Sequence, residues 1–182
     1  MKLHVVDTQL MRETTGSLLW LSNCTRPDIT MAVNYLARFI TQPTIGHWRA
    51  VKHLLRYLKG TPTTGIYFQH GHQTHTSVKP VMYLDADWAG DQEDAKSTFG
   101  GVLTINGAPI TWYSKKQSTV ALSTAEAEYI AAGTAVRDCL WIQQLLNGLR
   151  LHPESSPVYL HVDNQSAIKL WKRVDFPADE AH

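Results

Sequence analysis

The segment VMYLDADWAGD (residues 81–91) decides the fold of the second half of the chain. It begins with a short apolar run, Val81–Leu84, which is typical of a buried strand. Asp85 follows directly, so the predicted strand ends in a carboxylate. An aspartate in this place usually serves as a turn residue or a helix cap, and that alternative stays open for Asp85 taken alone.

Strand signals continue after this segment. Gly100–Ile105 and Pro109–Ser114 are both strand candidates. The Asn106-Gly107 pair between them predicts a two-residue hairpin turn, because both residues tolerate a positive φ. The second half of the chain is therefore expected to begin with three neighbouring strands.

A long helix is predicted after the hairpin. Ser123 or Thr124 opens it, acidic residues in its first turns favour its dipole, and it ends near Leu149. Residues 157–162 then form a further strand, and residues 165–171 form a short helix. This order predicts an α/β fold in which a mixed sheet is flanked by helices.

Three acids fall at the ends of these elements. Asp85 ends the first strand, Asp163 follows the later strand, and Glu128 lies in the first turns of the long helix. If the two strands are neighbours and the helix packs across them, the three carboxylates converge, and their repulsion requires a cation. Mg²⁺ prefers such oxygen ligands, and two ions about 4 Å apart can activate a water and stabilise the leaving oxygen of a phosphodiester. The predicted chemistry is hydrolysis of a nucleic-acid backbone.

Two neighbouring acids are rivals for these positions. Asp87 would share a strand face with Asp85. Glu126 lies about 200° around the helix from Glu128, so the two cannot face the same ion. Glu128 is the preferred ligand.

The first 60 residues predict a small helical segment. An apolar stretch lies at residues 15–22, Pro27 starts a helix that Pro43 ends, and a further helix stops at Gly60. The residues predicted to face inward are Ile29, Ala32, Val33, Leu36 and Ile40 in the first of these helices, and Trp48, Val51, Leu54, Leu55 and Leu58 in the second. The cations on the remaining surface, which suit either a phosphate-binding face or an ordinary solvated one, are Arg49, Lys52, Arg56 and Lys59.

Polar residues separate the two halves. Ile66–Phe68 is a short strand candidate, and residues 71–78 are predicted to be a linker because they lack periodicity. His70, His72 and His75 could form a metal tract, but no fourth ligand lies nearby, so the linker interpretation is preferred.

Composition narrows the class of protein. Apolar residues make up 43% of the chain, which is enough for a buried core. Only Cys24 and Cys139 are present, and neither a signal peptide nor a membrane-spanning run is apparent, so an intracellular location, cytoplasmic or nuclear, is expected. Residues 1–78 carry eight Lys and Arg against three Asp and Glu, whereas the remainder carries nine against thirteen. This asymmetry fits a polyanion-binding module beside an acidic metal site, and it also fits chance.

Short strings across the chain resemble the end of the Pol polyprotein of copia-type LTR retrotransposons. They are GSLLWLS (16–22), TRPDI (25–29), HW (47–48), LLRYLKGT (54–61), LDADWAGD (84–91), KS (96–97), ITWYSKKQ (110–117), VALSTAEAEY (120–129) and DNQSAI (163–168). None is decisive alone, and it is their shared order over residues 15–171 that carries the resemblance.

The resemblance implies a division into three parts. Residues 1–70 look like the thumb and connection that end the reverse transcriptase, 71–78 like a linker, and 79–182 like the tethered ribonuclease H domain. That domain has a ribonuclease H-like mixed sheet flanked by helices, and it cleaves the RNA strand of RNA–DNA hybrids. It uses Mg²⁺, expected here as two ions, and Mn²⁺ can substitute.

Site residues are carried over by motif. Asp85, Glu128 and Asp163 match the catalytic metal ligands, the same acids that the strand and helix ends indicate. The predicted contacts to the hybrid are Ser123, Thr124, Lys115, Lys116, Gln117 and Asn164. A solvated turn is the alternative for the two lysines.

The sequence departs from the family at both ends. The reverse transcriptase palm is missing, so no polymerase activity is expected. Residues 170–182 do not resemble the family's C-terminal segment, so a fourth acidic ligand and a last helix are expected to be lost. Four residues near the C-terminus have side chains of the kind that could bind metal, but nothing in the sequence places them at the site. They are Asp175, Asp179, Glu180 and His182.

These departures leave two alternatives to an active nuclease. One is a catalytically inactive remnant of a retroelement that at most binds nucleic acid. The other is an α/β binding domain in which the acids are only caps, which the ordered motifs disfavour.

Overall fold

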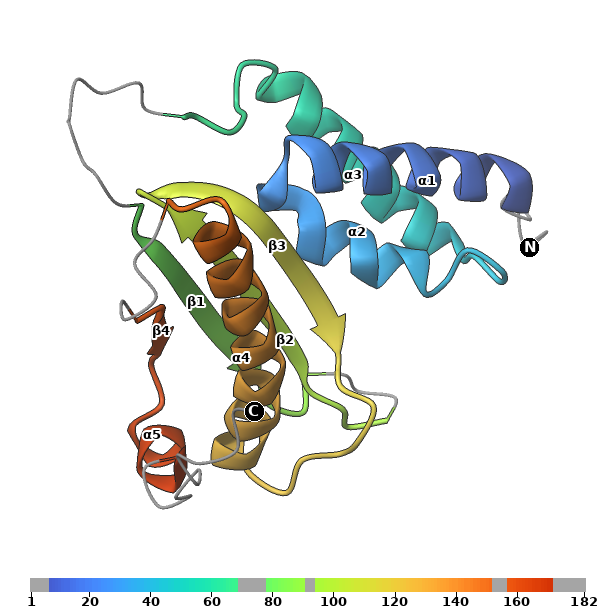
Figure 1. Cartoon of the computed structure of the whole chain (residues 1–182). Helices are drawn as coiled ribbons and strands as arrows, with labels where there is room; N and C mark the ends of the chain where they lie inside the picture. Colours follow the sequence, from blue (N-terminus) through green and yellow to red (C-terminus); the bar gives the residue numbers. More distant parts are fainter. Residues whose placement is uncertain (1–6, 69–77, 91–93, 152–156, 172–182) are drawn as a thin grey trace. The chain divides into compact units, whose positions relative to one another are not determined.

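The structure is a computed structural model that describes residues 7–68, 78–90, 94–151 and 157–171. These residues form two units, one from the helices of the first 70 residues and one from a sheet and the later helices (Figure 1). The three histidines considered as a metal tract, and the C-terminal residues considered as a fourth ligand, lie outside the described residues.

The first unit is helical, as predicted. Its elements are α1 (Thr8–Cys24), a 3-10 turn η1 (Pro27–Ile29), α2 (Thr30–Ala37) and α3 (Ile45–Gly60). Asp7 caps α1, because its carboxylate accepts hydrogen bonds from the backbone N–H groups of Gln9 and Leu10. The helices share one apolar core, whose buried residues are Met11, Leu18, Ile29, Val33, Leu36, Val51 and Leu54.

Three details of the helical prediction were wrong. The predicted helix before Pro43 ends already at Ala37, so Ile40 lies outside it, and Ala32 is exposed. Residues 38–43 instead form the connection between α2 and α3, and a capping box at Thr44 sets the start of α3. Leu55, predicted to face inward, is 41% exposed because it lies 100° around α3 from Leu54.

The strand predicted at Ile66–Phe68 does not form. These residues have no regular secondary structure, and Tyr67 and Phe68 are 78% and 63% exposed. The local pattern suits a strand, but a strand also needs a neighbouring strand for its backbone groups.

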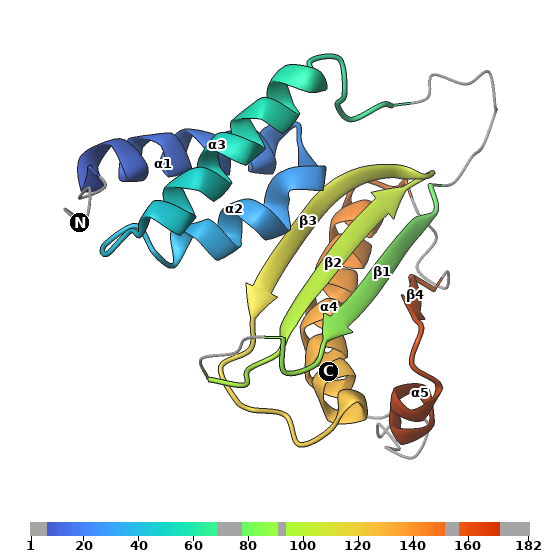
Figure 2. The ribbon, with the colours of Figure 1, turned by 180° about the vertical axis from the view of Figure 1, so that it is seen from behind.

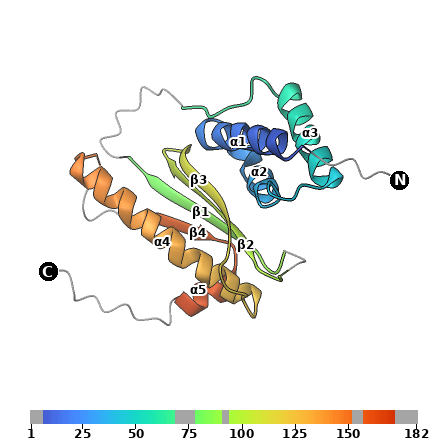
Figure 3. The same cartoon turned by 90° about the vertical axis from the view of Figure 1, so that its right-hand side faces the viewer.

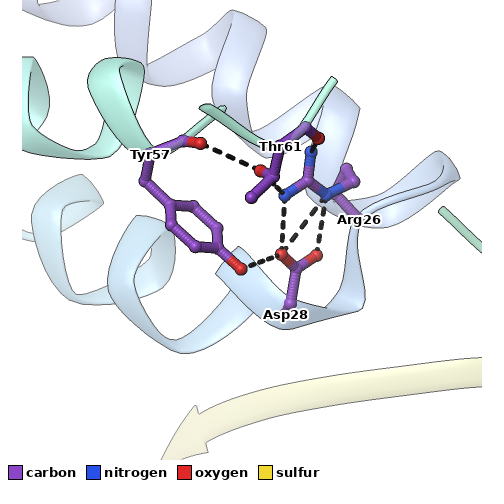
Figure 4. Close-up of polar contacts among 4 residues, drawn as sticks. All are labelled: Arg26, Asp28, Tyr57 and Thr61. Carbon is purple, nitrogen blue, oxygen red and sulfur yellow. Dashed lines mark hydrogen bonds and ion pairs between the residues drawn. The ribbon is translucent and has the colours of Figure 1, made fainter. Parts of the chain in front are cut away.

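An ion pair between a buried arginine and a partly exposed aspartate joins η1 to the end of α3 (Figure 4). Arg26 is 5% exposed, and its guanidinium donates to both carboxylate oxygens of Asp28, with a shortest distance of 2.7 Å. It also donates to the backbone O and the Oγ1 of Thr61, and the hydroxyl of Tyr57 donates to Asp28 at 2.9 Å. Residues far apart in sequence are therefore held together by charge-assisted hydrogen bonds.

The second unit is the predicted mixed sheet with flanking helices. Its elements are β1 (Pro80–Asp87), β2 (Thr98–Ile105), β3 (Ala108–Lys116), α4 (Thr124–Gly148), β4 (Tyr159–Val162) and α5 (Gln165–Trp171). The strand order is β3-β2-β1-β4, in which β1 runs antiparallel to β2 and parallel to β4. Asn106 and Gly107, which join β2 to β3, both have a positive φ, as the predicted hairpin turn requires.

Helix α4 packs along one face of the sheet (Figures 1 and 3). The opposite face, seen in Figure 2, is covered by no described helix of this unit. On the covered face, Met82 and Leu84 of β1 are buried. The small side chains of Ala127, Ala131 and Ala135 are also buried, at every fourth position of α4, and they allow the helix backbone to approach the sheet closely.

Among the described residues, no helix is both long and apolar enough to cross a membrane. The intracellular location stays a prediction.

Candidate metal centre

Two neighbouring parallel strands bring two of the predicted acids to the same level of the sheet. Leu84 of β1 pairs with Val162 of β4, and Asp85 and Asp163 are the residues that follow. Because the strands run in the same direction, both carboxylates lie at the same end of the sheet. Both side chains are exposed, so the site is open to solvent.

Helix α4 brings the third acid to this point. Glu128 lies in the second turn of α4 and is 4% exposed. The backbone N–H of Ala86, the residue after Asp85, donates to Oε1 of Glu128 at 3.1 Å. Asp85, Glu128 and Asp163 each offer one carboxylate oxygen, and these oxygens lie within 4.8 Å of one another. The structure therefore brings together the three acids that the sequence indicated.

The electrostatics of Glu128 disfavour its ionised form. Burial raises the pKa of Glu128 above its ordinary value, the hydrogen bond from Ala86 opposes this rise, and the charges of Asp163 and Asp85 add to it. Its Oε2 is buried and has no hydrogen-bond partner among the described residues. A buried acceptor beside two further carboxylates fits a hard divalent cation, which would satisfy Oε2 and neutralise the repulsion.

The two rival acids have other surroundings. Glu126 is part of the N-terminal cap of α4, since its Oε2 accepts from Leu122 N at 2.7 Å and its own N–H donates to Ser123 Oγ at 3.1 Å. The carboxylate of Asp87 lies over Gly90, where a Cβ atom would come within 2.8 Å of its Cγ. Neither belongs to the cluster of Asp85, Glu128 and Asp163.

Three of the predicted hybrid contacts lie at helix starts next to the acids. Ser123 is the N-cap of α4, and Thr124 is exposed beside it. The Oδ1 of Asn164 accepts from the backbone N–H groups of Ser166 and Ala167, so this side chain orients the start of α5 directly after Asp163. Contacts from these residues to the backbone of an RNA–DNA hybrid stay a prediction.

The remaining predicted contacts lie at the end of β3. Lys115 is exposed, and the ammonium of Lys116 lies 2.8 Å from a carboxylate oxygen of Asp94. Gln117, by contrast, is 4% exposed, and its Nε2 donates to the backbone O of Ala127 at 2.7 Å. The structure gives Gln117 an interior place, because its amide holds α4 instead of facing solvent.

Sequence reasoning did not single out two residues beside this site. The indole Nε1 of Trp88 donates to Ala121 O at 3.0 Å, which ties the end of β1 to the segment before α4. Ser97 is fully buried, and its Oγ accepts from Ala89 N at 3.2 Å. The only signal was that both residues lie within the strings that carried the family resemblance.

Comparison with known proteins gives a consistent family. No family model and no solved structure matches the chain. The chain is 44% identical over 169 residues to the retrovirus-related Pol polyprotein from transposon TNT 1-94 of Nicotiana tabacum, a match that covers 92% of the chain and 12% of that polyprotein. It is 41% identical over 164 residues to the polyprotein from transposon RE2 of Arabidopsis thaliana, covering 90% of the chain and 11% of the relative.

A shorter relative carries the same segment. The secreted RxLR effector protein 161 of Plasmopara viticola is 43% identical over 127 residues, which cover 70% of the chain and 87% of that protein. The chain thus spans only a small part of the Pol polyproteins that it matches over most of its own length. By sequence, the chain belongs to the retrovirus-related Pol polyproteins of copia-type transposons.

Proposed function

We propose that the sheet-containing unit is a ribonuclease H, which hydrolyses the RNA strand of RNA–DNA hybrids with divalent metal held by Asp85, Glu128 and Asp163. The observation that carries the proposal is the cluster of three carboxylate oxygens within 4.8 Å, one of them from a buried glutamate. Membership of the Pol polyprotein family supports a nucleic acid as the substrate. Mg²⁺ is the proposed ion, and Mn²⁺ is the proposed substitute.

Each acid has a distinct part in this proposal. When bound, the divalent ions would supply an activated water and stabilise the leaving oxygen of the phosphodiester. Glu128 accepts a hydrogen bond from the backbone N–H of Ala86 in β1 and would bind metal from the buried side of the site. Asp85 and Asp163 are exposed and form its open side, where a backbone phosphate can approach. Contacts from Ser123, Thr124, Lys115, Lys116 and Asn164 to phosphate or 2′-hydroxyl groups would orient the strand.

Cleavage of a labelled RNA–DNA hybrid in Mg²⁺ tests the proposal. The wild-type chain is expected to cleave the RNA strand, whereas Asp85→Asn removes a ligand charge and is expected to abolish cleavage. Asp87→Asn is the matched control, since it lies two residues away on the same strand and outside the cluster. Equal rates for the wild type and Asp85→Asn, including zero for both, would contradict the proposal.

A second candidate function is nucleic-acid binding without cleavage, and the surface of α3 favours it. Arg49, Lys52, Arg56 and Lys59 are all exposed. Steps of three and four residues place these cations on one helix face about 15 Å long. Helix α3 has no acidic residue. Such a face suits the phosphates of a nucleic acid, whatever its sequence.

The double substitution Lys52→Gln and Arg56→Gln is expected to weaken binding of a duplex to about the same extent for every sequence. The slope of log affinity against log salt should fall by about two, because each lost phosphate contact removes about 0.9 from it. Fluorescence anisotropy at several salt concentrations measures both quantities. Arg12→Gln combined with Arg137→Gln is the control, since it makes the same change in net charge on other helices. An equal loss of affinity in the control would assign the effect to net charge alone.

A further inference from the structure

We propose that Trp88, Ser97 and Gln117 form a hydrogen-bonded network that positions Glu128 for metal binding. The inference rests on the proposed function, because it concerns the same three acids. It assigns a positioning role to residues that are not members of the carboxylate cluster.

The network joins the segments on both sides of the acid cluster. Trp88 follows β1 and donates through Nε1 to Ala121 O at 3.0 Å, in the segment between β3 and α4. Ser97 precedes β2, where its Oγ accepts from Ala89 N at 3.2 Å and its backbone O accepts from Gln117 N at 2.8 Å. The chain after β1 and the end of β3 are therefore fixed to one another.

Gln117 extends this network into α4. Its Nε2 donates to Ala127 O at 2.7 Å, and Ala127 directly precedes Glu128. Ser97, Gln117 and Ala127 are 0%, 4% and 0% exposed, so water does not compete for these bonds. A bond of this length in the interior restrains the first turns of α4, and with them the backbone of Glu128.

The bond from Trp88 joins the same parts of the chain as the bond between Ala86 and Glu128, namely the end of β1 and the region of α4. Ala86 donates to Glu128, and Trp88, two residues on, donates to Ala121. The end of β1 is thus bonded both to α4 and to the segment that leads into it. The bond from Trp88 therefore adds a second hydrogen-bonded restraint between this end of β1 and the chain that carries Glu128.

The burial of Gln117 indicates that the amide has a positional role. Its Oε1 is buried and has no hydrogen-bond partner among the described residues. An unmatched buried acceptor lowers the stability of a fold, so an apolar side chain of similar size would suit the interior at least as well. With 4% of its surface exposed, Gln117 acts on the site through Ala127 and not by contact with substrate.

The test measures metal affinity directly. Mg²⁺ and Mn²⁺ are titrated into the full chain by calorimetry, comparing the wild type with Gln117→Met and Trp88→Phe. Gln117→Met keeps the approximate length of the side chain and replaces its amide, including the Nε2 donor. Trp88→Phe keeps an aromatic ring and removes the indole N–H. The matched controls are Gln144→Met and Trp141→Phe, both exposed on α4.

Gln117→Met and Trp88→Phe are each expected to weaken metal binding by about tenfold, as loss of a residue that orients a ligand does. The controls are expected to bind like the wild type. In EDTA, the unfolding temperature of Gln117→Met should be unchanged or higher, because the substitution also removes the unmatched Oε1. This combination separates positioning from a purely structural role, which would lower the unfolding temperature.

Three outcomes would overturn the inference. Metal affinities equal to the wild type in both variants would exclude positioning, and lost hybrid binding at unchanged metal affinity would assign direct contacts instead. A tenfold loss in the controls as well would show that the effect is not specific. If Gln117→Met does not fold, the metal affinity of Trp88→Phe decides between these outcomes. Trp88 is 45% exposed, so its substitution should disturb the core less. A wild-type chain that binds no metal would refute the proposed function itself, which is a different result.

Discussion

Substitution of Glu128 by glutamine is expected to lower the rate of hybrid cleavage about a thousandfold or more. Metal ions supply several kcal/mol of transition-state stabilisation, and each 1.36 kcal/mol corresponds to a factor of ten in rate. The glutamine has the same shape and keeps an acceptor for the Ala86 N–H, so the loss comes from the charge. Single-turnover cleavage with saturating Mg²⁺ measures the effect.

The same substitution is expected to stabilise the metal-free chain at neutral pH. Burial first, and then the nearby aspartates, raise the pKa of Glu128 in the folded state above its unfolded value. Below the unfolded pKa both states are protonated, and the penalty is absent. As pH rises through the folded pKa, the buried group ionises and wild-type stability falls relative to the variant.

Thermal unfolding in EDTA from pH 4 to 8 measures this second effect. The unfolding temperature of Glu128→Gln should exceed that of the wild type at pH 7, and the difference should shrink towards pH 4. Adding Mg²⁺ should raise the wild-type value and affect the variant much less. Glu126→Gln is the control, as its carboxylate lies on the cap of α4. A variant less stable than the wild type at pH 7 without metal would contradict this account of the site.

Substitution of Asp28 by asparagine is expected to destabilise the helical unit by about 2–3 kcal/mol. It leaves the guanidinium of Arg26 buried without an anionic partner, a change that costs roughly 3–5 kcal/mol in fully buried pairs. The lower figure applies because the side chain of Asp28 is 29% exposed. Urea unfolding followed by circular dichroism measures the loss.

The control for Asp28→Asn is Asp7→Asn, the same chemical change at the N-cap of α1. Asparagine caps helices about as well as aspartate, so Asp7→Asn should change stability little. The ion pair of Arg26 and Asp28 also predicts that the stability of the helical unit depends on pH, because the hydrogen bond from Arg26 lowers the pKa of Asp28. The contribution of Asp28 is present above its unfolded pKa and is lost as pH falls through its folded pKa. A difference between the wild type and Asp28→Asn that persists below that pKa would show that charge is not its cause.

The acid cluster could be anticipated from the sequence because each member lies at a readily recognised end of an element. Asp85 follows the apolar run Val81–Leu84, although β1 continues for two residues beyond it to Asp87. Asp163 follows β4, and Glu128 lies shortly after the N-cap of α4, so local patterns place all three. Their convergence within 4.8 Å agrees with that expectation, whereas their binding of metal stays a prediction.

What the sequence could not supply is the partner of each polar group. Gln117 stands in a polar string beside two lysines, and nothing in that string predicts a bond to Ala127, ten residues on. Arg26 likewise meets Thr61 across 35 residues. Periodicity reports which face of an element is apolar, but it does not report which distant backbone group a buried side chain will meet.

Strand β4 is a four-residue strand at the margin of the sheet, and β1 is its only neighbour among the strands that the structure describes. Few backbone bonds hold so short an edge, yet the residue after it is one of the three proposed ligands. An ion that joins Asp163 to Asp85 would bind only the docked form of the strand, so ion occupancy and closure of the sheet edge become linked equilibria. The divalent cation would then stabilise the docked strand as well as take part in the chemistry, and removal of the metal would weaken the pairing of β4 with β1.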